Sequence, residues 1–117
     1  MRMWMQPVDE MCLQHRSGEH NEYHKHEHNW RKRHSIAGRV AGNAIEPLAY
    51  KRRHDELAAT FAGHKTPIEQ PDFSYLPPEH LNARVDVEAA RKLLHTRCPK
   101  CRALWEEKHL KSERRTR

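Results

Sequence analysis

Apolar residues recur at the three- and four-residue spacing of an amphipathic helix in the middle of the chain. Between Pro47 and Gly63, Leu48 and Leu57 belong to an apolar stripe, while the basic residues 51–53 occupy the other side. Proline is favoured in the first turn of a helix, and glycine is favoured just past its end. The pattern therefore predicts a central helix over residues 47–63.

Weaker periodic segments predict further helices from Asp9 to about Lys25, over 35–42, from about Asp86, and from Pro99. Asp9 suits the N-cap of the first of these helices. Gly18 interrupts it, which indicates a local break or the close approach of another backbone. Val87, Ala90, Leu93 and Leu94 are expected to face inward from the helix that begins near Asp86. A shorter helix should begin at Pro99 and include Leu104 and Trp105.

The segment 64–78 contains four prolines and is expected to be an ordered loop. Phe73, Tyr75 and Leu76 should pin this loop onto the core. No strand-like alternation and no internal repeat is present in the sequence. We therefore predict a compact all-α fold with one domain over residues 1–117, in which residues 108–117 form a frayed basic tail.

Composition makes nucleic acid the favoured partner. The chain of 117 residues has a formal net charge of +6, and its 11 histidines can add positive charge near neutral pH. Solubility alone could explain the basic balance, but polyanion binding is its commonest use. Hydrophobic residues make up 36% and charged residues 32% of the chain, so any core should be thin.

The cysteine count and the hydropathy favour a cytoplasmic location. Three cysteines cannot form a disulfide framework, and a reducing compartment is the simpler assumption. No apolar run approaches the roughly 20 residues that cross a membrane. The N-terminus also lacks the apolar core of a signal peptide.

The first 25 residues carry the most economical candidate chemistry. A chain-terminal amine beside a carboxylate can act as a nucleophile with an acid/base partner. Met1 is expected to be retained because Arg2 is large, and the cation of Arg2 would lower the pKa of the amine. Glu22 is the candidate carboxylate.

The pattern of Gln14-His15 followed by Glu22 resembles the pyrimidine-dimer DNA glycosylase family of the phage endonuclease V type. The basic segment 31–34 and the segment 48–66 resemble a basic stretch and the central helix of that family. Pro77-Pro78 and Ala90-Arg91 resemble parts of its C-terminal half. The similarity spans most of the chain and is closest in residues 1–25 and 48–66.

The resemblance implies a compact helical fold, with the N-terminal segment packed between helices, and a repair enzyme that acts on double-stranded DNA. The amine at Met1 would attack C1′ of the damaged nucleotide and form an imine, and Glu22 would manage the protons. A β-elimination would then cleave the strand. The resemblance implies no metal or cofactor, and we expect a monomer in the cytoplasm of a bacterial or phage-infected cell.

The resemblance also assigns DNA-binding residues. These are Arg2, Gln14, His15, Asn21, Lys25, Arg31, Arg33, His34 and Arg91. Asn21 stands where the family has an arginine, which weakens phosphate binding and bears on which lesion is accepted. The tyrosine-rich tail of the family is absent, and Trp105 is at most a partial substitute.

Three alternatives remain open at this stage. The same chemistry could act on another damaged or modified base, or the chain could be a non-catalytic basic module that binds nucleic acid or protein. A zinc site at His95, Cys98, Cys101 and His109 is a weak candidate because a lone CxxC usually needs a second ligand pair of matching spacing. Histidines 20, 24, 26, 28 and 34 could indicate a His-Asn nuclease with one catalytic metal, although the strand signal of that class is missing.

Overall fold

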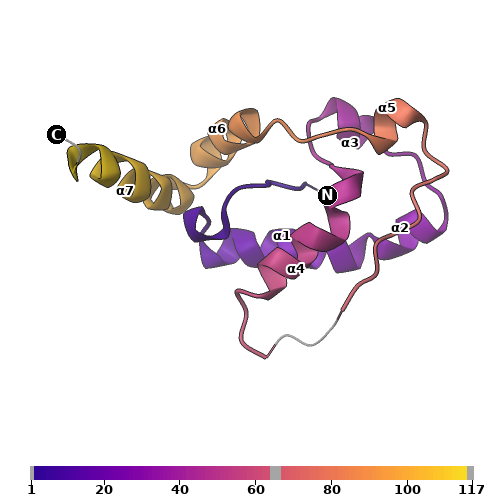
Figure 1. Cartoon of the computed structure of the whole chain (residues 1–117), viewed down its shortest axis with the longest axis horizontal. Helices are drawn as coiled ribbons and strands as arrows, with labels where there is room; N and C mark the ends of the chain where they lie inside the picture. The colour runs from indigo at the N-terminus through magenta and orange to yellow at the C-terminus, as the bar shows by residue number, and fades with distance from the viewer. Residues whose placement is uncertain (1, 64–66, 116–117) are drawn as a thin grey trace.

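A computed structural model describes residues 2–63 and 67–115, with side chains through residue 110. The described part of the chain is helical and contains no strand, as predicted (Figure 1). The elements in chain order are η1 (Val8–Glu10), α1 (Leu13–Lys25), α2 (Glu27–Arg31), α3 (Ala37–Ala41), η2 (Pro47–Ala49), α4 (Tyr50–Ala58), α5 (Pro78–Leu81), α6 (Val87–Arg97) and α7 (Pro99–Arg115).

The centre of the fold is the packing of α1 against α4. Tyr23 of α1 and Tyr50 of α4 are completely buried, and their rings meet edge to face with centroids 4.7 Å apart. The Tyr50 hydroxyl donates to the Tyr23 carbonyl at 2.5 Å. Trp30 and Phe73 extend the cluster around the Tyr50 ring. Edge-to-face aromatic pairs of this kind add stability beyond the area that they bury.

The N-terminal segment, residues 2–7, runs through the middle of the molecule, between α1 and the connection that leads to α6 (Figure 1). Met3 is completely buried, and its N–H donates to the Ala44 carbonyl at 2.8 Å. The Gln6 amide donates to the carbonyls of Trp4 and Val87, at 2.9 and 2.8 Å. The expected packing of the N-terminal segment between helices is therefore confirmed.

The first helix begins later than predicted. Asp9 lies in the 3-10 turn η1 and is not an N-cap, because Met11 and Cys12 are extended and α1 begins at Leu13. Lys108 of α7 bonds to both Asp9 and Glu10, which ties η1 to the C-terminal helix. Gly18 does not break α1.

The central helix is shorter than predicted. It consists of η2 followed by α4 and is capped at Ala59, while Gly63 lies in a later turn with φ +78°. Leu48 is 62% exposed, so it does not belong to the apolar stripe. The sequence analysis did not predict α2 or α5, which are too short to show a period.

The C-terminal predictions hold in part. Asp86 caps α6 by accepting from the Ala89 N–H at 3.1 Å, and α7 begins at Pro99. Ala90 and Leu94 are buried, whereas Val87 is 50% exposed. The backbone of residues 108–115, expected as a tail, belongs to α7.

Phe73 and Leu76 are buried and pin the proline-rich segment onto the core, as predicted. In the described part of the chain, no helix is both long and apolar enough to cross a membrane.

Candidate active site

An open cleft of about 550 Å³ lies along α1 beside the N-terminal segment. Its lining residues are Arg2, Trp4, Gln14, His15, Gly18, Glu19 and Glu22. Four of the residues assigned by sequence (Arg2, Gln14, His15 and Glu22) therefore meet in one place. Met1, the predicted nucleophile, lies outside the described residues.

One face of α1 presents most of the predicted site. A helix turns by 100° per residue, so Gln14, Gly18, Asn21, Glu22 and Lys25 fall within about 100° of one another around the helix axis. Asn21 and Lys25 are exposed, whereas Glu22 is half-buried. The two exposed residues thus flank the cleft-lining residues on the same side of the helix.

The adjoining, buried side of α1 holds the N-terminal segment through an ion pair that the sequence did not predict. Glu19 accepts from the Trp4 N–H at 3.1 Å and from the Tyr23 hydroxyl at 2.9 Å. Arg53 of α4 donates to both oxygens of Glu19, at 2.7 and 3.1 Å. Burial lowers the pKa of Arg53, but the hydrogen bond and charge of Glu19 outweigh burial and raise it. The carboxylate thereby joins three segments and fixes the backbone two residues after Arg2.

Glu22 contacts a histidine one turn further along the chain. The His26 Nε2 lies 2.9 Å from a Glu22 oxygen. Burial lowers the pKa of His26, although the charge of Glu22 acts in the opposite direction. The imidazole therefore places a hydrogen-bonding group beside the Glu22 carboxylate.

Arg2 is anchored on the other wall of the cleft. Its guanidinium donates to the Gly42 carbonyl at 3.3 Å and lies 5.2 Å from the centre of the Trp4 ring. The Trp4 ring in turn meets the His15 ring edge to face. The cleft thus offers a cation, an aromatic wall and a carboxylate within one concave surface.

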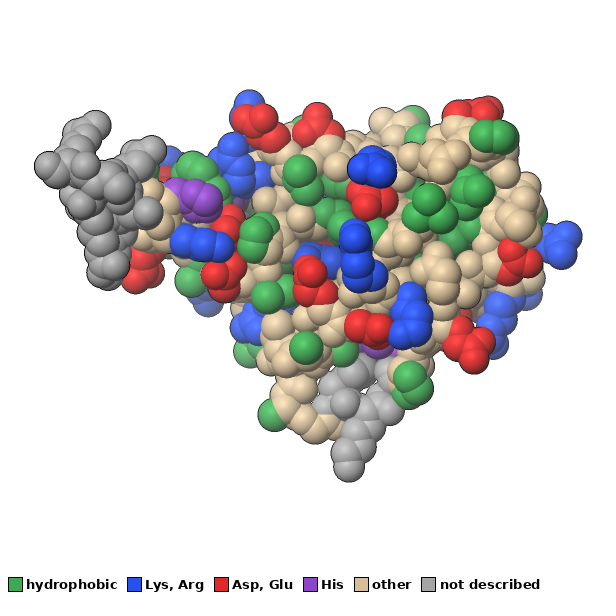
Figure 2. Space-filling model, in the orientation of Figure 1, with side chains coloured by type: hydrophobic (Ala, Val, Ile, Leu, Met, Phe, Trp, Pro, Cys, Tyr) green, Lys and Arg blue, Asp and Glu red, His purple; other side chains and the backbone are tan. Residues whose placement is uncertain are grey.

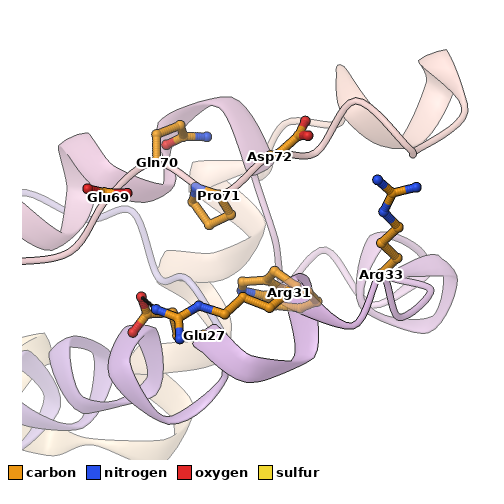
Figure 3. A pocket seen from close by; sticks show the side chains of 8 residues that line it. Glu27, Arg31, Arg33, Glu69, Gln70, Pro71 and Asp72 are labelled. Atoms are coloured by element: carbon orange, nitrogen blue, oxygen red, sulfur yellow. Dashed lines mark hydrogen bonds and ion pairs between the residues drawn. The ribbon is translucent and has the colours of Figure 1, made fainter.

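Arg31 and Arg33 line a different pocket, of about 340 Å³ (Figure 3). Arg31 bonds to Glu27 at 2.8 Å, and Arg33 lies on the side of Asp72. His34 is exposed, and its carbonyl accepts from the Tyr75 hydroxyl at 2.7 Å. The structure does not bring this basic segment into the cleft of Glu22.

Arg91 also lies outside that cleft. Its guanidinium lies 4.4 Å from the centre of the Trp105 ring and faces a groove beside Met5 and Gln6. The Trp105 ring stacks on His109 as well. Arg91 and Trp105 therefore form a surface of their own, next to the N-terminal segment.

His95 and His109, suggested by sequence as zinc ligands, do not join Cys98 and Cys101 in the structure. Cys98 and Cys101 meet Cys12 and His15, and their candidate ligand atoms all lie within 4.8 Å of one another. His95 packs against Trp105, while His109 pairs with Glu10 at 3.3 Å. Cys12-x2-His15 repeats the spacing of Cys98-x2-Cys101, and this second pair was the signal that sequence reasoning overlooked.

The histidines that suggested a nuclease separate in space. His20 and His24 converge with His54 of α4, and the Nε2 atoms of His24 and His54 lie 2.9 Å apart. His26 lies beside Glu22, whereas His28 and His34 are exposed. The described residues contain no strand that could form the scaffold of a His-Asn nuclease.

The face of the molecule shown in Figure 2 has no concentration of positive charge. On the face shown in Figure 2, Lys and Arg side chains alternate with Asp and Glu side chains and surround apolar patches. The net charge of +6 therefore makes no continuous basic surface on that face.

Comparison with protein-family models, with curated proteins and with solved structures finds no match to this chain.

Proposed function

We propose that the protein is a DNA repair enzyme that combines glycosylase and AP-lyase activities at pyrimidine dimers. The observation that carries this proposal is that Arg2 and Glu22 line the same cleft, together with Gln14 and His15. The resemblance of residues 1–25 to the pyrimidine-dimer glycosylases assigns roles to these same residues. The proposal requires the amine of Met1 to enter this cleft.

In the proposed reaction, the neutral amine attacks C1′ of the damaged nucleotide. The C1′–N bond breaks and its electron pair goes to the base, which takes up a proton and, in a dimer, stays joined to the neighbouring base. The amine nitrogen gives one proton to O4′ as the C1′–O4′ bond opens, which leaves a protonated imine at C1′. Removal of a 2′ proton then sends electrons toward C3′ and expels the 3′ phosphate. Water hydrolyses the imine and regenerates the amine.

Glu22 is the proposed proton carrier in both steps. It is half-buried in the cleft wall, where its carboxylate would lie near the positive charge that develops at C1′. Arg2 would contact a phosphate, and Gln14 and His15 would contact the nucleotides around the flipped position. The exposed Asn21 would lie at the edge of this contact.

Borohydride trapping tests the imine. The chain beginning at Met1, incubated with abasic-site DNA and borohydride, should become covalently linked to the DNA. A matched chain with one extra residue before Met1 should give no adduct. Equal trapping of the two chains would exclude the terminal amine, and no trapping of either would leave only a non-catalytic binding module.

Glu22→Gln tests the carboxylate. Strand cleavage should fall by on the order of 100-fold while DNA binding is retained, because the amide cannot carry the proton. Glu27→Gln is the matched control, since Glu27 lines the other pocket and pairs with Arg31. Equal losses in the two variants would contradict the role of Glu22.

The substrate is tested separately. Ultraviolet-irradiated duplexes and duplexes with modified bases should be compared under the same conditions. If the enzyme cleaves only the duplexes with modified bases, the imine chemistry stands and a modified base replaces the dimer as the substrate. This is the alternative that Asn21 raises.

A further inference from the structure

Three buried thiols and one imidazole converge where the start of α1 meets the junction of α6 and α7. Cys12 precedes α1, and His15 lies in its first turn. Cys98 caps the end of α6, and Cys101 lies in the first turn of α7. Each cysteine side chain is at least nine-tenths buried.

The distances are those of a metal site and not of a disulfide. The Cys12 and Cys98 sulfurs lie 3.7 Å apart, which is far beyond an S–S bond of about 2.05 Å. The His15 Nδ1 lies 3.2 Å from the Cys12 sulfur and 3.7 Å from the Cys101 sulfur. In a tetrahedral zinc site, with Zn–S bonds of about 2.3 Å and a Zn–N bond of about 2.0 Å, sulfurs lie about 3.8 Å apart and sulfur and nitrogen about 3.5 Å apart. The observed spacing therefore fits one zinc ion.

Backbone donors already point at the sulfur atoms. The Cys12 N–H lies 3.3 Å from the Cys101 sulfur, and the Cys101 N–H lies 3.4 Å from the Cys98 sulfur. Hydrogen bonds of this kind orient ligands and offset the negative charge of thiolates.

We propose that Cys12, His15, Cys98 and Cys101 bind one Zn²⁺ as a structural site. Thiolate ligands select zinc over magnesium and calcium. Four protein ligands close the tetrahedron and leave no position for water or substrate, so this metal stabilises the fold and does not take part in the reaction. The site joins the N-terminal and C-terminal parts of the chain and holds His15 in the wall of the cleft. The zinc proposal does not rest on the proposed glycosylase activity.

Cobalt substitution tests the ligand set on the complete chain. Purified protein should contain one zinc per chain by elemental analysis. The Co²⁺ form should show the thiolate-to-cobalt charge-transfer band and the intense visible bands of a tetrahedral S₃N site. A folded chain that takes up neither metal, or a cobalt spectrum without charge transfer, would overturn the proposal.

Substitutions distinguish this ligand set from the one suggested by sequence. His95→Asn and His109→Asn should retain full zinc and an unchanged cobalt spectrum, whereas Cys98→Ser and Cys101→Ser should lose tight binding. His15→Cys keeps a complete ligand set, so it should fold, retain zinc and gain charge-transfer intensity. Zinc loss in the His95 or His109 variant, or an unchanged spectrum in His15→Cys, would refute the assignment.

Discussion

Gly18 lines the cleft and leaves α1 without a side chain at that point. A Cβ at this position would meet no protein atom within 4 Å, and the helix continues through it. Gly18→Ala should raise the free energy of unfolding by about 1 kcal/mol, because alanine is the better helix former. If a nucleotide occupies the cleft, the same methyl group should weaken binding of abasic-site DNA several-fold.

Gly38→Ala is the matched control, because Gly38 in α3 is equally open but does not line the cleft. Both variants should gain stability in urea unfolding, and only Gly18→Ala should lose DNA affinity. Unchanged affinity in Gly18→Ala would mean that the nucleic acid does not approach this part of α1.

Asn21 is the residue at which the protein departs most clearly from the family that it resembles. Asn21→Arg should restore a phosphate contact beside Glu22 and tighten binding to duplex DNA. The logarithm of the affinity should then fall more steeply with the logarithm of salt concentration, by about 0.9 per added contact. Thr96→Arg adds the same charge at an exposed site of α6. An equal change of slope in both variants would indicate a general effect of charge.

At the scale of elements, α1 and α4 are joined by polar groups as much as by apolar contacts. Arg53→Met would leave the Glu19 carboxylate buried without its partner and should lower the free energy of unfolding by about 3–5 kcal/mol. Arg52→Met is the adjacent control, because Arg52 is exposed and lies 3.8 Å from Glu46, so it should cost less than about 1 kcal/mol. If urea unfolding gave similar losses of unfolding free energy for Arg53→Met and Arg52→Met, the importance of the buried pair would be contradicted.

The same pair explains why α1 was difficult to interpret from sequence. Its buried side contains Glu19, His20 and Tyr23, so it lacks the apolar stripe that marks a core-facing helix. The structure gives the helix two polar faces, one that lines the cleft and one that is paired internally.

At the scale of the whole molecule, the proposed zinc site connects the start of α1 with the junction of α6 and α7. Besides the cysteine and histidine cluster, η1 contacts α7 through Lys108 and Glu10. Removing zinc with a chelator should lower the melting temperature by about 15 °C if free zinc exceeds its dissociation constant 1,000-fold, which corresponds to about 4 kcal/mol.

Calorimetry with and without chelator measures this shift, and re-addition of zinc should reverse it. Acidification to about pH 5 should also release the metal, because protons compete for the thiolates and the imidazole. A native melting temperature that does not respond to chelator, or that responds no more than the melting temperature of Cys98→Ser, would contradict the prediction.

Local sequence signals determined the helical class, the starts of α6 and α7, and the presence of Gln14, His15 and Glu22 on the first long helix. These features depend on caps, prolines and the period of a helix, which act over a few residues. The loop anchors Phe73 and Leu76 could likewise be found from their apolar character within a polar segment.

Only the tertiary structure decided which distant groups meet. Cys12 and Cys98 are separated by 86 positions, and Glu19 and Arg53 by 34, so no local period relates them. In the sequence, His15 fits a DNA contact, and the histidines nearest to Cys98 and Cys101 are His95 and His109. Packing of α1 against α4, and of η1 against α7, places His15 beside both the cleft and the cysteines. That convergence arises because burial and hydrogen bonding act through space, and it cannot be read from neighbours along the chain.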